Sequence, residues 1–325
     1  MDWIEKFTNM MFPINRNDSK VDLAVLLKDQ NLPNSIFKYR EVGKRSIQNL
    51  EEDTIWLADP SSFNDPYDCS HAVDFNKVQK ANSLDFFNQL LEKQKDKINL
   101  SDETLEKLKL AEDPYNELLE LIFSQQAPEV VTAFKNVQQK MLEDLSRSGS
   151  SLVSTSFKLC SFSECNDSIL MWAHYADNHK GFCIEYDLVN SPVNDPRRRS
   201  LYPTIYSRKM FDATEHIMKK RDSEDFNSSH LTLGSLVKAE EWNYEKEWRL
   251  VFPFGIMDKA QAFKFGVPKM VHLGARISED DQVKIIEICK RKNIPVQKMK
   301  MHHNIFKLES VQLRDAGQNF FKDKP

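Results

Sequence analysis

The sequence predicts an α+β protein in which a β-rich domain carries a large helical insertion. No glycine occurs between Gly43 and Gly149, and apolar residues recur at helical spacing over residues 75–150 within this interval. From Ser151 onward, short segments alternate apolar and polar residues, which is typical of strands. Near the C-terminus, the stretch "SEDDQVKIIEICKRKNI" lies between two such segments and predicts a strand-helix-strand unit.

Length and charge limit the classes of protein to consider. A chain of 325 residues is long enough for one large domain, and its 21 Phe and 5 Trp can fill a core. We expect a helical lead-in at 1–34 and a single domain at 35–325. The formal net charge of −4 gives no overall electrostatic case for nucleic-acid binding, although local basic runs such as Arg197–Arg199 permit it.

The five cysteines and the apolar segments bear on location. The cysteine count is odd and the spacing irregular, which favours reduced thiols over a disulfide framework or a zinc site. The N-terminal stretch is too short and polar for a signal peptide, and no apolar run approaches the length of about 20 residues that a membrane span needs. We therefore expect a cytoplasmic protein without a membrane partner and without a metal site.

The first elements after the lead-in are two strands separated by a polar segment. Ser35–Arg40, "SIFKYR", follows a proline and alternates as a strand, with Arg40 at its polar tip. Thr54–Asp68 begins as a strand and continues into "DPSSFNDPYD", whose prolines, serines and Asx residues predict a loop that bonds to its own backbone. This loop either is structural, with Asn64 and Asp65 capping turns, or positions a substrate through Asp65 and Asp68.

N-cap residues and prolines predict where the helices of the insertion and of the later part of the chain begin and end. Ser101 before "DET" is a good N-cap, and two prolines divide the insertion into three or four helices. "DSILMWAHYAD" predicts a short helix that begins after Asp167 or Ser168 and presents Trp172 and Tyr175 on one aromatic side. The C-terminal helix is expected to begin after Ser278.

The stretch "NYEKEWRLVF", Asn243–Phe252, raises the sharpest chemical question. Read as a strand, it places Glu245 and Glu247 on one face and Lys246 on the other. Two carboxylates on one face repel each other, which raises the pKa of one of them unless a ligand or a cation such as Arg249 holds them. The simpler alternative is that Glu245 pairs with a basic residue while Glu247 stays solvated.

Several of these stretches together resemble a widespread bacterial family that is catalogued only as a domain of unknown function. Its pattern is F-N-D-P-x-D, a serine-rich strand, M-W-x-x-Y with a later glycine, E-x-E-W/Y-R, and a late L-G strand before a helix. Here these motifs are Phe63–Asp68, Met171–Tyr175 with Gly181, Glu245–Arg249, and Leu273-Gly274. The resemblance runs from about residue 36 to 310.

The order of these motifs is also similar to that of ADP-ribosyltransferases of the arginine–serine–glutamate type. That resemblance implies a mixed split-sheet fold and NAD as the substrate, with Glu247 as the catalytic glutamate and Glu245 as the glutamate on the acceptor side. The cofactor-binding and substrate-positioning residues that it implies are Tyr39, Arg40, Ser161, Ser163, Trp172 and Tyr175, with Asn64, Asp65, Asp68 and Arg249. The serine motif here is S-F-S at Ser161–Ser163, and a literal S-T-S at Ser154–Ser156 is the alternative.

The function that this resemblance implies is transfer of ADP-ribose from NAD to a protein or nucleic-acid acceptor. A bacterial toxin or an anti-phage defence effector, with a neutralising antitoxin as a possible partner, fits that activity. Two alternatives stay open. Asp65, Asp68, Glu245 and Glu247 could hold Mg²⁺ in a nuclease or phosphodiesterase, or the site could bind a nucleotide without turnover.

Overall fold

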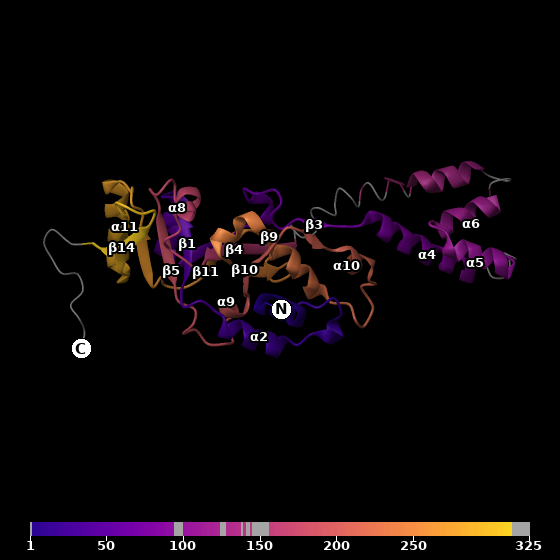
Figure 1. The fold of residues 1–325 in the computed structure, drawn as a ribbon, viewed down its shortest axis with the longest axis horizontal. Coiled ribbons are helices and arrows are strands. Elements are labelled where there is room, and N and C mark those ends of the chain that lie inside the picture. Colours follow the sequence, from indigo (N-terminus) through magenta and orange to yellow (C-terminus); the bar gives the residue numbers. More distant parts are fainter. Residues whose placement is uncertain are drawn as a thin grey trace.

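The computed structural model describes residues 2–93, 100–123, 128–137, 139–140, 144 and 156–313. Its centre is a mixed sheet of eight strands, in which all neighbours are antiparallel except β12 and β13 (Figure 1). In spatial order the strands are β14 (Leu308–Gln312), β13 (Val296–Met301), β12 (Met270–Leu273), β5 (Phe182–Tyr186), β1 (Ile36–Arg40), β4 (Phe157–Ser163), β10 (Glu247–Pro253) and β6 (Leu201–Pro203). The α+β prediction is confirmed.

The sheet is weakly joined between β1 and β4. Five residue pairs join β1 to β5 and seven join β4 to β10, but only Phe37 and Ser163 pair across the β1–β4 junction. The described strands therefore form one continuous sheet, in which strand pairing is minimal at the β1–β4 junction.

Strand alternation sorts the side chains of the sheet onto two faces, each with its own core. On β5, Phe182 and Ile184 join the largest core cluster, whereas Cys183 lies in a different cluster on the other face. The largest cluster includes residues of α3 (Lys44–Glu52), α11 (Glu279–Lys292), and β2 (Thr54–Leu57), which pairs with β11 (Gln261–Lys264). The opposite face is covered over β1 and β5 by α8 (Ile169–Tyr175).

Two helices begin directly after the N-cap residues that the sequence predicts. The Ser278 hydroxyl accepts a hydrogen bond from the Asp281 backbone N–H at the start of α11. Of the two candidate caps of α8, the structure uses Ser168, whose hydroxyl accepts from the Met171 N–H. Both caps satisfy N–H groups that the first helical turn leaves without an internal partner.

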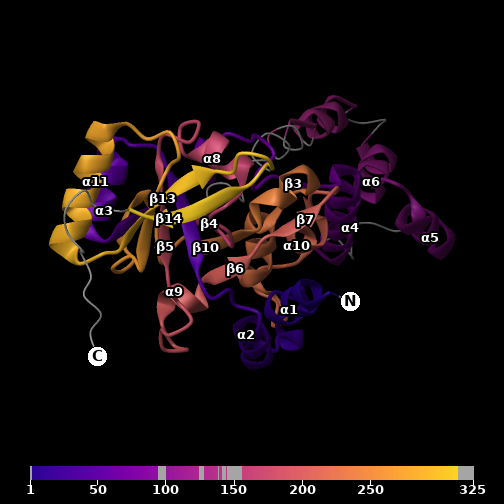
Figure 2. The same cartoon turned by 60° about the vertical axis from the view of Figure 1, so that its left-hand side comes forward.

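The N-terminal region is helical, as expected. Helices α1 (Trp3–Met11) and α2 (Val21–Gln30), with the 3-10 turn η1 (Arg16–Asp18) between them, pack beside the sheet (Figure 2). Phe7 and Phe12 share a core cluster with Leu159 of β4 and Val251 of β10. These two strand residues lie on the same face as Ser161 and Glu247, so the lead-in packs against the part of the sheet next to the polar residues.

The helical insertion extends away from the sheet as an arm (Figure 1). It contains α4 (Phe75–Lys93), α5 (Asp102–Leu110), α6 (Pro114–Phe123) and helical residues at 128–137. Phe87, Leu108 and Leu118 form a small core of its own, which explains the apolar stripe in the sequence. The Ser101 cap of α5 is present, because its hydroxyl accepts from the Thr104 N–H.

Short elements connect these parts. They are η2 (Pro60–Ser62), β3 (His71–Ala72) paired with β8 (Phe211–Asp212), α9 (Pro196–Arg199), β7 (Ile205–Ser207) paired with β9 (Val237–Ala239), α10 (Thr214–Met218), η3 (Ser228–Ser235) and η4 (Glu240–Glu245). None of the helices in the described ranges is both long and apolar enough to cross a membrane.

Candidate functional site

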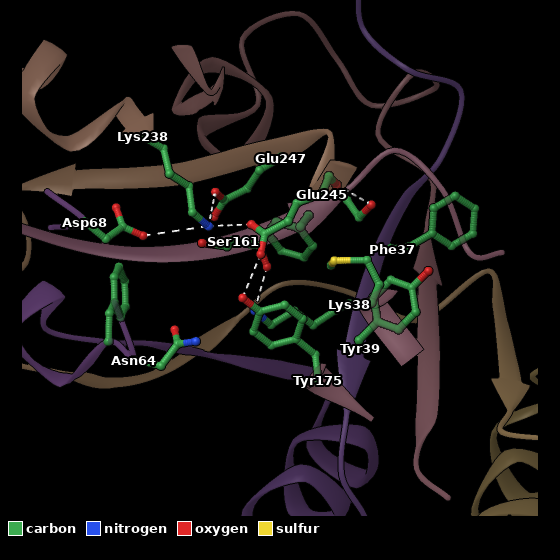
Figure 3. A pocket seen from close by; sticks show the side chains of 14 residues that line it. Phe37, Lys38, Tyr39, Asn64, Asp68, Ser161, Tyr175, Lys238, Glu245 and Glu247 are labelled. Carbon is green, nitrogen blue, oxygen red and sulfur yellow. Dashed lines mark hydrogen bonds and ion pairs between the residues drawn. The ribbon is translucent and has the colours of Figure 1, made fainter. Parts of the chain in front are cut away.

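A cavity of about 160 Å³ opens on the α8 side of the sheet, beside the β1–β4 junction (Figure 3). Its walls come from β1, β4, β9, α8, the loop after β2, and the start of β10. The lining residues are Phe37, Lys38, Tyr39, Phe63, Asn64, Asp68, Ser161, Phe162, Ser163, Met171, Tyr175, Lys238, Glu245 and Glu247. The structure therefore brings together eight of the residues that the sequence singles out.

The two glutamates reach this cavity through a turn. The expected strand over Asn243–Phe252 is wrong in its first part, because Glu245 ends the 3-10 helix η4 and Lys246 adopts a left-handed conformation with φ 45°. Strand β10 begins only at Glu247. The Ser163 hydroxyl donates to the Glu245 carbonyl at 2.7 Å, which fixes the turn against β4. Both carboxylates point inward, although strand alternation is not the reason.

Lys238, on β9, neutralises the carboxylates that line the cavity. Its ammonium forms an ion pair with Glu245 and lies 3.2 Å from a Glu247 carboxylate oxygen and 3.8 Å from Asp68 (Figure 3). All four side chains are buried. Because buried charges are costly unless they are paired, this network is what keeps three acidic groups together inside the protein.

Arg249 binds two of these acids, Asp68 and Glu247, from outside the cavity. It is fully buried, and its guanidinium donates to both Asp68 carboxylate oxygens, at 2.7 and 2.8 Å. It also donates to Glu247 at 3.0 Å and to the Ser235 carbonyl at 2.8 Å. Arg249 is not among the cavity-lining residues, so it positions the acids and does not face the cavity itself.

The environments of the two glutamates separate their pKa values. Burial alone favours the neutral acid, but Arg249 and Lys238 outweigh it and hold the pKa of Glu247 at about 2. For Glu245, burial and then repulsion from Glu247 raise the pKa, against the opposing effect of Lys238. The network contains three acids, Asp68, Glu245 and Glu247, and two bases, Lys238 and Arg249, so one negative charge has no matching positive charge. Of the two glutamates, Glu245 is the one whose ionised form is penalised. Raising of one pKa was expected, and the structure identifies Glu245 as the affected group.

Tyr175 extends the network into the cavity. Its hydroxyl donates to Glu245 at 2.7 Å (Figure 3), and burial and the neighbouring Glu245 raise its pKa. Asn64, from the loop after β2, lies beside it. Tyr175 therefore stays protonated and helps to fix the orientation of the Glu245 carboxyl group.

The serine motif at Ser161–Ser163 belongs to the cavity wall. Ser161 hydrogen-bonds Glu247, and Ser163 is fully buried, with its hydroxyl donating to the Glu245 carbonyl. Of the alternative motif, Ser154 and Thr155 lie outside the described residues. Within the described part of the chain, Ser161 and Ser163 are thus the serines in contact with the two glutamates.

Besides Arg249, three residues expected at the site lie outside the cavity lining. Arg40 is not among the lining residues, and Trp172 is fully buried in the core, where its indole N–H donates to the Asn166 carbonyl at 2.6 Å. Asp65 is also absent from the lining, and its carboxylate accepts from the Tyr67 N–H at 2.8 Å, which is a turn-capping role. Tyr39 does line the cavity, and its hydroxyl donates a hydrogen bond to the Cys165 carbonyl.

Two lysines of the site were missed by the sequence reasoning. Lys238 lies in the three-residue strand β9, which is too short to produce a periodic signal. Lys38 lines the cavity where Arg40 does not. Alternation of β1 gives no signal for this, because it places Lys38 and Arg40 on the face of Ile36, opposite Phe37 and Tyr39.

Gly181 is required by the close contact between the α8–β5 turn and β1. A Cβ atom at this position would lie 2.0 Å from the Arg40 carbonyl oxygen and 3.0 Å from Ala176. No side chain fits in that space, so the glycine that follows the M-W-x-x-Y motif has a steric reason. The contact fixes α8, and with it Tyr175, relative to β1.

Comparison with protein families gives a match to part of the chain. The model of the family described as "Protein of unknown function (DUF2971)" matches residues 171–250. This segment contains Tyr175, Lys238, Glu245 and Glu247, but neither β1 nor β4. Neither the curated proteins nor the solved structures include a match.

Proposed function

We propose that the protein is an NAD-dependent ADP-ribosyltransferase that cleaves the nicotinamide–ribose bond and transfers ADP-ribose to an acceptor. The observation that carries this proposal is the pair of neighbouring carboxylates in one cavity with oppositely shifted pKa values. Such a pair is a common way to supply an ionised group and a proton-exchanging group in the same site. The proposal includes a fold similar to that of the ADP-ribosyltransferases.

Glu247 has the properties needed to stabilise positive charge. Breaking the glycosidic bond of NAD develops an oxocarbenium-like cation on the ribose. Glu247 remains ionised at neutral pH, because its pKa is held at about 2. Its position is fixed by Arg249 at 3.0 Å and Lys238 at 3.2 Å, so little reorganisation is needed when charge develops. A hydrogen bond from the ribose 2′-hydroxyl to this carboxylate would place the negative charge next to the reacting carbon.

Glu245 has the properties needed for proton transfer. Its raised pKa moves it toward the working pH, which is favourable for a general base. The hydroxyl of Tyr175 orients the carboxyl group, and the Lys238 ammonium contacts its other oxygen. In the proposed reaction Glu245 accepts the proton of the attacking nucleophile, whether this comes from a protein or a nucleic acid.

The size of the cavity decides how much of the substrate it can enclose. At about 160 Å³ it is below the 300–1,000 Å³ of typical ligand pockets. It can enclose one ring-sized group, and aromatic side chains such as Phe37 and Tyr175 line it. The nicotinamide end of NAD fits this description, whereas the adenosine end would lie outside the cavity.

The metal-dependent alternative is less compatible with the geometry. A divalent ion held by Asp68, Glu245 and Glu247 would need the position that the Lys238 ammonium already takes among the three carboxylates. Asp65, the fourth expected ligand, caps a turn instead. Nucleotide binding without turnover remains the competing outcome of the test below.

The test is nicotinamide release from NAD by the purified protein, in the presence and absence of a cell extract. We expect release by the wild type and its loss in Glu247→Gln, with a smaller defect in Glu245→Gln. Glu241→Gln is the matched control, since Glu241 is an exposed acid on η4 that does not line the cavity. Equal activity of wild type and Glu247→Gln would overturn the proposal, and so would NAD binding without release under every acceptor condition.

A further inference from the structure

Lys38 differs from Lys158 and Lys238, two other internal lysines, because it contacts no carboxylate. Its ammonium donates to the Ser161 carbonyl at 2.6 Å and lies 5.8 Å from the Phe162 ring centroid. Within the described part of the chain, no carboxylate forms an ion pair with it. By contrast, Lys238 contacts three carboxylates and Lys158 contacts the Asp59 carboxylate at 2.8 Å. An ammonium has three N–H donors; the Ser161 carbonyl and the Cys160 side chain account for two of them, so Lys38 keeps one donor for a ligand.

The side chain with this unused donor lies at a cavity. Lys38 lines the cavity at the junction where β1 and β4 share a single residue pair, and Figure 3 shows its side chain among those that surround the space. Lys28 provides an internal comparison: it also contacts carbonyl groups, those of Arg198 and Arg199, but it does not line this cavity. Buried cations are normally paired, and a cation next to an open space can be paired by a ligand.

We propose that Lys38 forms an anion-binding position in this cavity and contacts a phosphate group of the ligand, the role that Arg40 was expected to fill. The identification of that phosphate as part of NAD rests on the proposed function, whereas the anion position does not. Arg40 lies two residues away on the same strand, carries the same charge and does not line the cavity. The two residues therefore form a natural matched pair.

Proton uptake gives the proposal a second readout. Burial lowers the pKa of Lys38; Cys160 and Glu247 oppose this effect, and Arg40 adds to it. The other titratable groups that line the cavity are Tyr39, Asp68, Tyr175, Lys238 and Glu245. A bound phosphate stabilises the charged ammonium and so raises this pKa; to the extent that the free protein holds Lys38 neutral, binding then takes up protons from the solution.

The experiment compares ligands that differ by one phosphate. Nicotinamide mononucleotide, nicotinamide riboside, NAD and inorganic pyrophosphate are titrated by calorimetry into wild type, Lys38→Met, Lys38→Gln and Arg40→Met, in two buffers of different ionisation enthalpy. Gln keeps a donor for the Ser161 carbonyl, so it tests the charge if the Met variant fails to fold. In both Lys38 variants we expect the phosphate-bearing ligands to bind roughly 10- to 100-fold more weakly, the range for a lost hydrogen bond to a charged group.

The remaining outcomes separate the two proposals. Riboside affinity should not change in the Lys38 variants, Arg40→Met should bind like the wild type, and proton uptake on phosphate binding should be smaller in the Lys38 variants than in the wild type. Pyrophosphate binding that depends on Lys38, without any NAD binding, would support the anion position and overturn the proposed function. NAD turnover with unchanged phosphate discrimination in Lys38→Gln, loss of that discrimination in Arg40→Met, or no binding of any ligand would overturn the role of Lys38.

Discussion

The opposite pKa shifts of Glu245 and Glu247 predict unequal losses of stability when each is replaced by Gln. For Glu247, a pKa lowered from 4.5 to about 2 corresponds to about 3 kcal/mol of folding free energy at neutral pH. Glu247→Gln removes the charge that Arg249 and Lys238 bind at 3.0 and 3.2 Å. We therefore expect it to lower the free energy of unfolding at pH 7 by about 3 kcal/mol.

Glu245→Gln should cost much less at the same pH. The folded state penalises the ionised form of Glu245, because burial and the charge of Glu247 both raise its pKa. Removing that charge relieves the repulsion and forfeits one hydrogen-bond acceptor for Tyr175 or Lys238, a loss of about 1 kcal/mol. The two substitutions are chemically identical and two residues apart, so each serves as the control for the other.

The pH dependence gives the two effects opposite signs. The contribution of Glu247 is fully present above pH 4.5 and is lost as the pH falls toward about 2, so wild-type stability should decline in that window and Glu247→Gln should decline less. The contribution of Glu245 is greatest below pH 4.5 and is lost as the pH rises through its raised pKa. Urea unfolding followed by circular dichroism from pH 3 to 8 measures both. An equal cost for the two variants at pH 7, or a larger one for Glu245→Gln, would refute the assigned electrostatics.

Two further substitutions, each with a matched control, test the charge network and the contact between the α8–β5 turn and β1. Lys238→Met should lower the free energy of unfolding by about 3–5 kcal/mol, because it leaves buried acids without their cation; Lys158→Met, whose partner carboxylate is 41% exposed, should cost clearly less in the same urea titration. Gly181→Ala should sharply lower the melting temperature, since the added Cβ would lie 2.0 Å from the Arg40 carbonyl oxygen, whereas Gly43→Ala, with no neighbour closer than 3.7 Å, should melt close to the wild type.

The sequence predicted the helices and strands that are determined by interactions between residues close together in the chain. The caps at Ser101, Ser168 and Ser278 and the apolar stripe of the arm were recognisable, because capping and helical periodicity involve residues only a few positions apart. The strands β1, β4 and β5 were likewise readable from alternation. Sheet order was not, because it depends on contacts between segments far apart in the chain.

The candidate site was only partly readable for the same reason. Alternation placed Glu245 and Glu247 together by assuming a strand, but the left-handed backbone at Lys246 makes a turn there, and Lys is not a residue whose chemistry predicts that conformation. Lys238 enters from a three-residue strand, and its role appears only once β9 is placed beside the glutamates. Choosing between Lys38 and Arg40 required knowing where the sheet loses its pairing.

The route by which the arm joins the sheet gives the molecule a mechanical property. The chain runs from Asp68 through the two-residue strand β3 directly into the first helix of the arm. Asp68 is also bound by both terminal nitrogens of the Arg249 guanidinium. The pairing of β3 with β8 and the hydrogen bond from the Asp74 N–H to the Thr214 hydroxyl lie between Asp68 and the arm, so they hold the base of the arm in place and separate any displacement of α4 from the charge network.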